Sequence, residues 1–401
     1  MNTLNTTKLF TRPFLNQFIL TPSLLPFTDT ELSELDNNLN QYEQLFLDPD
    51  IEKNLFDKNE LLASFAISKA ENSTLTLREA QDVYNFLLKS QEYSFISEKL
   101  KAKKKLTRKD YEKLEFFNIA RALRSFQTAQ IDEITPDFIK DLHRQLTQGL
   151  DVFQKYLPDF DVYRSGRWRN TDSIRVGLYK PAPYKEIKAG VEELLAWIKD
   201  HQTIASVSIF HTALYALHPF NNGNKRVSRV LEHIIVRSFG VNRKNLYSTS
   251  YYYHKEKERY YKYLFFSLER KNLNHFVSFF QEALVLSILS VIKTSLEVKR
   301  KTFLDNKGTD IQVKRICKPL IKRHEVQFKN LLKNVNGEVS RQTFVNYLQQ
   351  AIEEGVILRR VDGKATFYSL NISFQEEVTF RDMHNFIKTK LTFIPDEFKL
   401  A

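Results

Sequence analysis

The chain has almost no cysteine, with Cys317 as the only one among 401 residues. A single cysteine cannot form a disulfide within the chain, which excludes a disulfide-stabilised scaffold and favours a reducing compartment. No set of cysteine and histidine residues has the spacing of a zinc site. The sequence also contains no internal repeat and no low-complexity tract. These absences favour a globular protein of the cytoplasm.

The N-terminus lacks a long hydrophobic run. Lys8, Arg12 and Pro13 interrupt residues 1–20, so this segment is typical neither of a signal peptide nor of the roughly 20 apolar residues that span a bilayer. We therefore expect no membrane partner. The length allows two or three domains, and the formal net charge of +12 favours acidic partners, including ATP and nucleic acid.

The most informative segment begins with a predicted helix. Apolar residues recur at intervals of three and four over residues 203–217, and Pro219 is expected to end this helix. The same spacing returns over residues 227–235 and is closed by Gly240. Residues 218–229 cover the loop between the two helices and the start of the second helix, and their sequence is HPFNNGNKRVSR. His218 is therefore predicted to lie in a loop between two buried helices.

This loop has the features of an anion site. The free amides and the dipole of the second helix favour negative charge at its start. Arg226 and Arg229 share one helix face, and a guanidinium can bind two phosphate oxygens at once. The alternative is structural, because a histidine before a proline and solvated cations in a first turn are both common.

HPFNNGNKRVSR resembles the signature of Fic proteins, HxFx(D/E)GNGRxxR. The resemblance implies a helical bundle that transfers AMP from ATP to a protein hydroxyl, with His218 as the general base. It also implies that Arg226 and Arg229 hold the β- and γ-phosphates. The nucleotide-binding residues implied in this loop are Asn222, Gly223, Asn224, Lys225, Arg226 and Arg229.

Two positions depart from that signature. Asn222 replaces the acid that binds Mg²⁺ in the family, and an amide oxygen is expected to bind this ion more weakly. Lys225 replaces a glycine, as in the death-on-curing branch, whose members transfer phosphate. AMP transfer is the first expectation and a kinase-like phosphotransfer is the alternative. A third reading is a nucleotide-sensing DNA-binding regulator with a degenerate core.

An earlier segment, residues 61–79, resembles the N-terminal inhibitory helix of the same family. Glu71 and Asn72 match the end of that motif, whereas Ile67 occupies its usual Ser/Thr position. A Glu71 carboxylate against Arg229 would occupy the guanidinium that the γ-phosphate needs, so the enzyme would be autoinhibited. Alternatively, Glu71 has only a local structural role at the end of a helix. Just beyond, Thr76 and Glu79 predict a capping box.

Two further segments resemble parts of the Fic site. Residues 142–149 are similar to the helix end before the target-binding flap, and the alternation over residues 168–183 predicts a small β-hairpin over a cleft. Such a flap could pair with an extended target segment, although a plain surface hairpin fits equally. Residues 245–264 resemble the region that closes the nucleotide pocket, where Tyr260 and Tyr261 would flank the base. A buried aromatic stripe is the alternative.

The C-terminal part has a different pattern. Residues 311–371 contain two basic helices, a helix with Ser340 as N-cap, and two strands joined at Asp362 and Gly363, which is the order of a winged helix. DNA binding is one reading, and a scaffold or a contact with a second copy of the chain is the other. The residues expected to face DNA are Arg341, Gln342, Asn346, Arg359, Arg360 and Lys364.

The expected protein is mostly α-helical and cytoplasmic. Residues 1–115 would form an N-terminal helical region with the inhibitory helix, residues 116–296 a Fic catalytic bundle with its flap, and residues 297–401 a winged-helix domain. The expected substrates are ATP, with Mg²⁺ as an accompanying ion, and a target protein that carries a Ser, Thr or Tyr hydroxyl.

Overall fold

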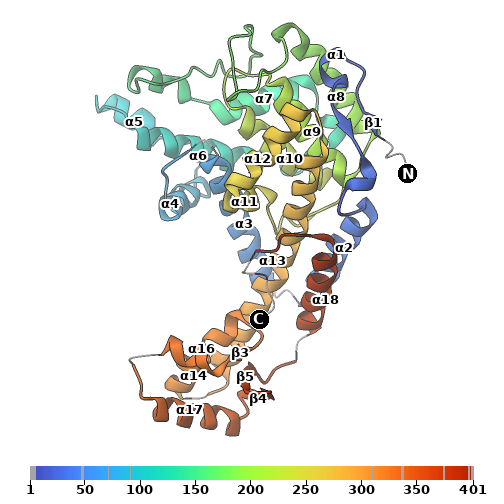
Figure 1. Cartoon of the computed structure of the whole chain (residues 1–401). Helices are drawn as coiled ribbons and strands as arrows, with labels where there is room; N and C mark the ends of the chain where they lie inside the picture. The colour runs from blue at the N-terminus through green and yellow to red at the C-terminus, as the bar shows by residue number, and fades with distance from the viewer. Residues whose placement is uncertain are drawn as a thin grey trace. The chain divides into compact units, whose positions relative to one another are not determined.

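The computed structural model describes residues 6–46, 49–70, 72–90, 92–308, 310–335, 338–373, 375–395 and 398 (Figure 1). The chain divides into two compact units, residues 1–38 with 48–287 and residues 39–47 with 288–401. Both are built mainly from helices, which confirms the mostly α-helical fold. The predicted boundaries at 115/116 and 296/297 both fall inside helices, namely α6 (Arg108–Ser125) and α13 (Asn274–Asn306).

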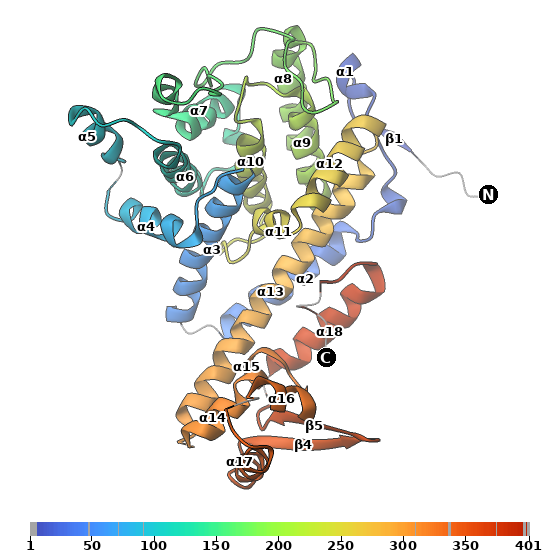
Figure 2. The same ribbon diagram turned by 60° about the vertical axis from the view of Figure 1, so that its left-hand side comes forward.

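Two helices at the centre of the first unit carry the loop that the sequence singles out. α9 (Ile204–Leu217) and α10 (Asn224–Ser238) lie side by side (Figure 2). Thr203 caps α9 by accepting a hydrogen bond from the backbone of Ser206, and every residue of α9 is buried. α9 also packs against α8 (Ile187–Asp200) and α12 (Lys257–Arg270). The predicted helix over residues 203–217 is therefore confirmed.

A second group of helices packs beside α10. α3 (Pro49–Lys69) and α6 contact each other and α10, and α4 (Leu77–Leu87) covers both of them. α7 (Pro136–Thr147) bridges α6 and α10, while α11 (Thr249–Lys255) packs on α3. The predicted capping box at the start of α4 is present, with Thr76 and Glu79 bonding each other's backbone amides. This group surrounds the side of α10 that carries Arg226 and Arg229.

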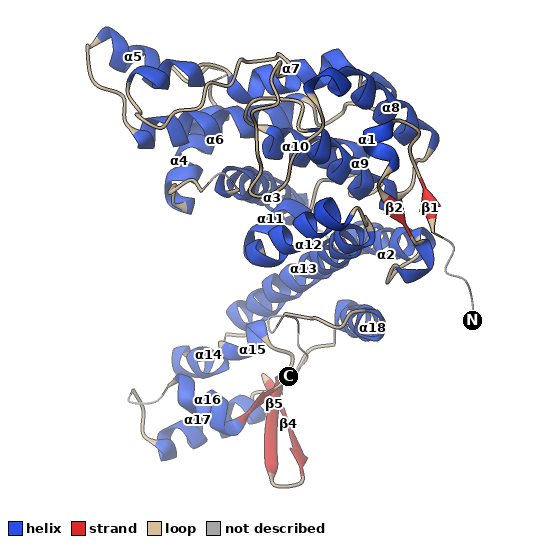
Figure 3. Ribbon diagram, turned by 45° about the horizontal axis from the view of Figure 1, so that its top comes forward, coloured by secondary structure: helices blue, strands red, loops and turns tan. Residues whose placement is uncertain are grey.

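Short elements complete the first unit. β1 (Thr7–Lys8) and β2 (Ile19–Leu20) form a small antiparallel sheet (Figure 3). The remaining helical elements are α1 (Pro13–Asn16), η1 (Pro22–Leu24), α2 (Asp29–Phe46), α5 (Phe95–Lys101), η2 (Ile131–Glu133), η3 (Leu150–Lys155) and η4 (Tyr184–Glu186). Among the described residues, α13 alone is long and apolar enough to cross a membrane, and 83% of its apolar window is buried, as in a core helix.

The second unit contains a three-stranded antiparallel sheet in the order β3, β5, β4. Its elements are α14 (Ile311–Cys317), α15 (Pro319–Lys322), β3 (Val326–Gln327), α16 (Phe328–Asn334), α17 (Arg341–Glu353), β4 (Ile357–Asp362), β5 (Ala365–Leu370) and α18 (Gln375–Lys390). Ser340 caps α17 and Gly363 turns the β4–β5 hairpin at φ 57°, as predicted. β3 was not predicted, because two residues are too short to show alternation.

Among the residues expected to face DNA, Gln342 donates a hydrogen bond to Asn346 (3.1 Å), and Arg360 has ion-pair partners in the second unit. Arg360 forms ion pairs with Glu325 (2.7 Å) and Asp362 (3.1 Å). Its guanidinium is therefore already paired with carboxylates of the protein. The winged-helix assignment of residues 311–371 stays a prediction.

Candidate active site

The loop between α9 and α10 has an unusual backbone. α9 ends at Leu217, and His218 adopts the left-handed conformation, with φ 51° and ψ 61°. Gly223 is also left-handed at φ 83° and caps the start of α10. A left-handed residue other than glycine costs roughly 1–2 kcal/mol. The conformation of His218 must therefore be imposed by the contacts around it.

Asn224 closes this loop with its side-chain amide. Its Oδ1 accepts a hydrogen bond from the backbone N–H of Phe220 (2.9 Å), and its Nδ2 donates to the carbonyl of Phe220 (2.8 Å). The ring of Phe220 is fully buried, stacked on His143 and 4.8 Å from Trp168. The loop is thus tied across its base and anchored in the core.

His143 in α7 connects this loop to a second segment. Its Nδ1 accepts a hydrogen bond from the backbone N–H of Gly166 (2.9 Å), so Nε2 carries the proton and donates to the carbonyl of Asn222 (3.0 Å). Burial lowers the pKa of His143 to about 3, so the ring stays neutral. Sequence reasoning did not identify this residue.

Arg169 is the other buried residue that holds the loop, and the sequence analysis missed it as well. Its backbone N–H donates to the carbonyl of Pro219 (2.8 Å). Its guanidinium donates to the carbonyls of His218 (2.8 Å), Leu217 (3.3 Å), Ala182 and Thr171 (2.7 Å). A guanidinium with several fixed N–H donors suits this clustering of carbonyls. The contact fixes the main chain that carries the His218 imidazole.

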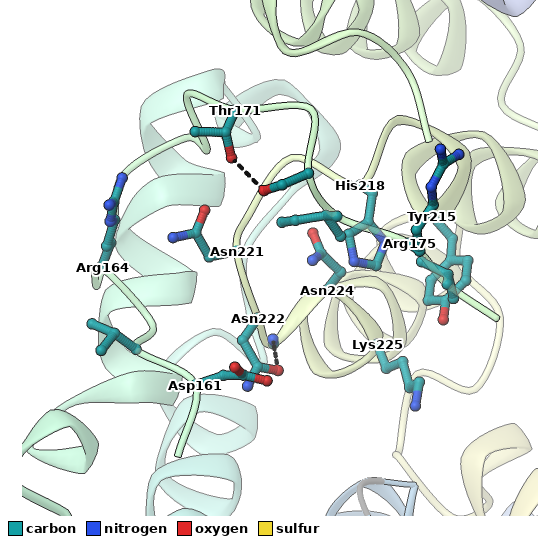
Figure 4. Close-up of a pocket in the computed structure, with 15 residues that line it drawn as sticks. Asp161, Arg164, Thr171, Arg175, Tyr215, His218, Asn221, Asn222, Asn224 and Lys225 are labelled. Atoms are coloured by element: carbon teal, nitrogen blue, oxygen red, sulfur yellow. Dashed lines mark hydrogen bonds between the residues drawn. The ribbon is translucent and has the colours of Figure 1, made fainter. Parts of the chain in front are cut away.

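A cavity of about 650 Å³ lies beside His218 (Figure 4). His218, Tyr215 and residues 221–225 line it from α9 and the start of α10, and residues 161–176 contribute the remaining lining. The rings of His218 and Tyr215 meet edge to face, with centroids 5.5 Å apart. The charged residues of the lining are Asp161 and three cations, Arg164, Arg175 and Lys225. The cavity is therefore polar and predominantly positive.

The predicted site residues separate into two groups. Those that line the cavity are His218, Asn222, Gly223, Asn224 and Lys225. Those that do not line it are Arg226, Arg229, Tyr260 and Tyr261. The loop signature predicted the first group together with Arg226 and Arg229. The four residues of the second group have contacts elsewhere in the first unit.

Arg226 is buried between α10 and α6. Its Nη1 lies 2.9 Å from the carboxylate of Glu115, and its Nη2 donates to the hydroxyl of Tyr163 (2.9 Å). Tyr111 donates to the same carboxylate at 2.8 Å and contacts the hydroxyl of Tyr163. In this structure the guanidinium is part of a buried polar cluster.

Arg229 lies one turn further along α10, against aromatic rings. Its guanidinium sits 4.3 Å from the ring centroid of Tyr260 and 5.4 Å from that of Tyr253, and its Nη1 donates to the carbonyl of Ala66 (3.3 Å). Burial raises the pKa of Tyr260 to about 12, so this phenol is neutral. Tyr260 is fully buried, and Tyr261 donates to the carbonyl of Ala70 (2.8 Å).

Glu71, the predicted inhibitory residue, lies outside the described residues. The end of α3 before it is tied to α10 and α12 through the bonds that Ala66 and Ala70 accept. On its other side, the Asn72 side chain accepts a hydrogen bond from Lys257 (2.8 Å). The neighbours of Glu71 in the chain are thus held beside Arg229 and Tyr261.

The predicted hairpin over residues 168–183 is reduced to one bridge pair. Val176 and Tyr179 exchange backbone hydrogen bonds of 3.1 Å around Gly177, and Leu178 at this turn is 95% exposed. The rest of the segment is irregular because its backbone groups bond to the end of α9, as Ala182 does to Ala216. It does line the cavity, as a flap would.

The lining offers little for a metal ion. Asn222 Oδ1 accepts a hydrogen bond from the backbone of Gly223 (2.7 Å), which engages the oxygen expected to bind Mg²⁺. Within the described part of the chain, no three His, Cys, Asp or Glu side chains are grouped as metal ligands. Asn222 therefore does not present a prepared ligand.

Part of the sequence that contains this site is similar to known proteins. Residues 133–236 match the Fic/DOC family. A segment of 121 residues is 28% identical to the protein adenylyltransferase fic-1 of Caenorhabditis elegans, covering 29% of this chain and 22% of that protein. Another of 94 residues is 28% identical to the probable protein adenylyltransferase aq_aa38 of Aquifex aeolicus (strain VF5), covering 22% of this chain and 29% of that protein. The chain thus spans less than a third of these relatives.

The fold is shared more widely. The crystal structure of a Fic family protein from Desulfovibrio desulfuricans G20 aligns with a TM-score of 0.50 at 20% identity. The alignment covers 88% of this chain and 99% of that chain. At this identity the likeness shows the fold alone.

Proposed function

Since residues 133–236 are a Fic/DOC domain, we propose that this chain is a protein adenylyltransferase. It transfers AMP from ATP to a Ser, Thr or Tyr hydroxyl of a target protein. The observation that carries the proposal is the placement of His218 beside a positive cavity whose lining includes the start of α10. Two relatives bearing the adenylyltransferase name support it.

In the proposed reaction, His218 accepts the proton of the target hydroxyl. The hydroxyl oxygen then attacks the α-phosphorus of ATP, the bond from that phosphorus to the bridging oxygen breaks, and pyrophosphate leaves. Asn224 brings a backbone N–H of the helix start to the cavity, where it favours phosphate oxygens, while the N–H of Gly223 donates to the Asn222 side chain. Lys225 adds a cation to the same wall.

The test uses ATP labelled separately at the α- and γ-phosphates. Transfer of α-label to protein is the expected result, and its loss in His218→Ala with an unchanged thermal unfolding curve supports the role of base. His201→Ala, an exposed histidine outside the cavity, is the matched control. Unchanged labelling by His218→Ala would refute the assignment of the base.

Phosphotransfer is the second candidate, and Lys225 is the observation that favours it. The side chain of Lys225 lines the cavity where the Fic signature has glycine, so a cation faces the phosphates of a bound nucleotide. Its Nζ lies 5.4 Å from the ring centroid of Tyr261. Transfer of γ-label without α-label would establish this reaction, and transfer of neither label would favour a nucleotide sensor.

We also propose that Glu71 restrains the activity by engaging Arg229. The bonds that tie Ala66, Ala70 and Asn72 to α10 and α12 support this arrangement. Glu71→Gly is expected to raise auto-modification, whereas Glu92→Gly, an exposed loop glutamate, is expected to leave it unchanged. Equal activity of wild type and Glu71→Gly would contradict autoinhibition.

The second unit is proposed to bind duplex DNA through the exposed start of α17 and the β4–β5 hairpin. Arg341, Gln342 and Asn346 are exposed on α17, and Arg359 and Lys364 are exposed on the hairpin. Binding of a labelled random duplex that weakens as salt is raised would support this proposal. A double variant, Arg341→Gln with Lys364→Gln, should then bind less tightly, and unchanged affinity would refute it.

A further inference from the structure

A second hollow adjoins the cavity beside His218. It has a volume of about 430 Å³ and is lined by Arg164, Ser165, Arg167, Trp168 and Asn170. Arg164 lines both hollows, so the two share one wall. The signature of the loop did not point to this region, and the proposed transfer reaction does not use it.

A tight turn presents two arginines to this hollow. The backbone N–H of Arg167 donates to the carbonyl of Arg164 (3.0 Å), and Gly166 within the turn has φ 71°. Arg164 is itself left-handed at φ 50°, which costs on the order of 1 kcal/mol or more for a residue with a side chain. Such a strained backbone persists only where surrounding contacts hold it.

Those contacts come from α7, where Thr147 and the carbonyl of Arg144 hydrogen-bond to Ser165. Gly166 donates its N–H to His143, whose ring stacks on Phe220 and bonds the carbonyl of Asn222. The turn bearing Arg164 and Arg167 is therefore fixed relative to His218. The side chains of Arg164 and Arg167 are exposed, but their backbone is held by the buried His143. Such side chains are suited to bind a partner in one fixed position relative to His218.

The charge of the hollow indicates the partner. Arg164 and Arg167 are both exposed, and among the described residues the guanidinium of Arg164 makes one hydrogen bond, to Asn170 (2.7 Å). Lys140 lies over the half-buried ring of Trp168, with its Nζ 5.3 Å from the centroid, and also forms an ion pair with the exposed Asp137 (3.0 Å). Within the described part of the chain, the residues that line this hollow include no acid. Cations around an aromatic surface fit carboxylates carried by a peptide.

We propose that the second hollow binds acidic side chains of the target protein close to the hydroxyl that is modified. This inference rests on the proposed function, since it assigns the substrate class of the same site. The hydroxyl enters the cavity beside His218, while carboxylates near it in the target pair with Arg164 and Arg167. The chain would thus select hydroxyls within acidic segments.

The test measures peptide binding to the full chain without nucleotide. Three fluorescein-labelled decapeptides carry one central tyrosine in a Gly/Ser background together with four Glu, four Gln or four Lys. Fluorescence anisotropy at low salt should give a dissociation constant for the Glu peptide about tenfold below that for the Gln peptide. The Lys peptide should bind most weakly.

A pair of variants locates the preference. Arg164→Asn with Arg167→Gln removes both cations, and asparagine tolerates the left-handed backbone. This double variant should lose most of the preference for the Glu peptide. The matched control, Lys180→Gln with Lys185→Gln, removes two exposed cations of the neighbouring segment that line neither hollow, and it should keep the preference.

Three results would overturn the inference. They are equal binding of the Glu and Gln peptides, a preference retained by the Arg164/Arg167 variant, and a preference lost equally in the lysine control. The last would show attraction by net charge alone. Failure of the proposed function appears separately, as absence of α-label transfer, because the binding assay contains no ATP.

Discussion

The imidazole of His143 lies parallel to the ring of Phe220, with centroids 3.8 Å apart and an interplanar angle of 3°. The same imidazole uses both nitrogens, one for Gly166 and one for Asn222. Gly166 lies in the turn between Arg164 and Arg167, and Asn222 lines the cavity beside His218. One neutral side chain in α7 thus positions the loop between α9 and α10 and the neighbouring cationic turn together.

Replacing His143 by phenylalanine should separate stacking from hydrogen bonding. His143→Phe keeps an aromatic ring against Phe220 but leaves the N–H of Gly166 and the carbonyl of Asn222 without their partner. Each unpaired buried group costs about 1–3 kcal/mol, so the free energy of unfolding should fall by about 2–6 kcal/mol. Denaturant unfolding measures this loss. A variant as stable as wild type would show that these hydrogen bonds contribute little.

The stability of the chain should decrease in mild acid. Burial lowers the pKa of His143 to about 3 and that of His233 to about 4. In the unfolded chain both titrate near 6.5, so between these values the unfolded state binds more protons than the folded state. Their contribution is complete above about pH 6.5 and is lost progressively as the pH falls toward 3–4.

Thermal unfolding from pH 7.5 to pH 4.5 checks this prediction. The Tm of wild type should decline with acid, and His143→Phe should decline less steeply because it lacks one of the buried histidines whose pKa is lowered. Parallel curves for the two proteins would contradict the assignment of His143.

The sequence predicted the parts of the site that are local in the chain. The apolar period before Leu217 and the end of the helix before Pro219 each depend on neighbouring residues, and the structure has them as expected. His143 and Arg169 were missed because their partners lie 79 and 49 positions away in the sequence, at Asn222 and His218. No spacing rule connects residues so far apart.

The aromatic segment around Tyr260 and the flap segment, residues 168–183, show a second limit of prediction from sequence, since each pattern fits two structures. Tyr260 stands in a pattern that fits either a nucleotide pocket or a core, and the structure buries it against Arg229. The alternation over residues 168–183 fits a hairpin, but the carbonyls of that region are taken by Arg169 instead of a partner strand. Tertiary contacts determine both the burial of Tyr260 and the irregular backbone of residues 168–183. These contacts cannot be read from the sequence pattern.

Gly223→Ala should impair the reaction more than it impairs folding. At φ 83° an alanine costs roughly 1 kcal/mol, and its Cβ would lie 3.4 Å from Nε2 of His143. Gly363→Ala is the matched control, since Gly363 has φ 57° and nothing within 4 Å of the added Cβ. Both variants should lose similar stability in denaturant unfolding. Only Gly223→Ala should lose label transfer, by about tenfold or more, and equal transfer by the two would refute this.

Arg169→Lys should lower activity while the protein stays folded. An ammonium keeps the charge but has three donors on one atom, so it cannot reach the carbonyls of His218, Leu217 and Ala182 together. The main chain at His218 is then less well positioned. We expect the rate constant at saturating ATP to fall at least about tenfold, with a smaller change in KM. Arg78→Lys, at an exposed arginine of α4, is the control, and a change confined to KM would argue against a positioning role.

The ion pair between Arg226 and Glu115 allows the role of Arg226 to be tested. Glu115→Ala leaves a buried guanidinium without its carboxylate, and breaking one side of such a pair costs about 3–5 kcal/mol. Replacing both residues, with Arg226→Met and Glu115→Leu, removes both buried charges and should restore most of the lost stability. Denaturant unfolding of the two variants measures this recovery. A double variant no more stable than Glu115→Ala would show that the pair is not the source of the loss.

The same double variant reports on the nucleotide. The resemblance to Fic proteins implies that Arg226 holds a phosphate. In that case the KM of the double variant for ATP should be raised by about tenfold or more, because a charge-assisted hydrogen bond contributes roughly 1.5–3 kcal/mol. Lys225→Met, which removes a cation that already lines the cavity, is the comparison. A stable double variant with an unchanged KM would instead confine Arg226 to the cluster with Glu115 and Tyr163, and would leave Lys225 and the start of α10 to hold the phosphates.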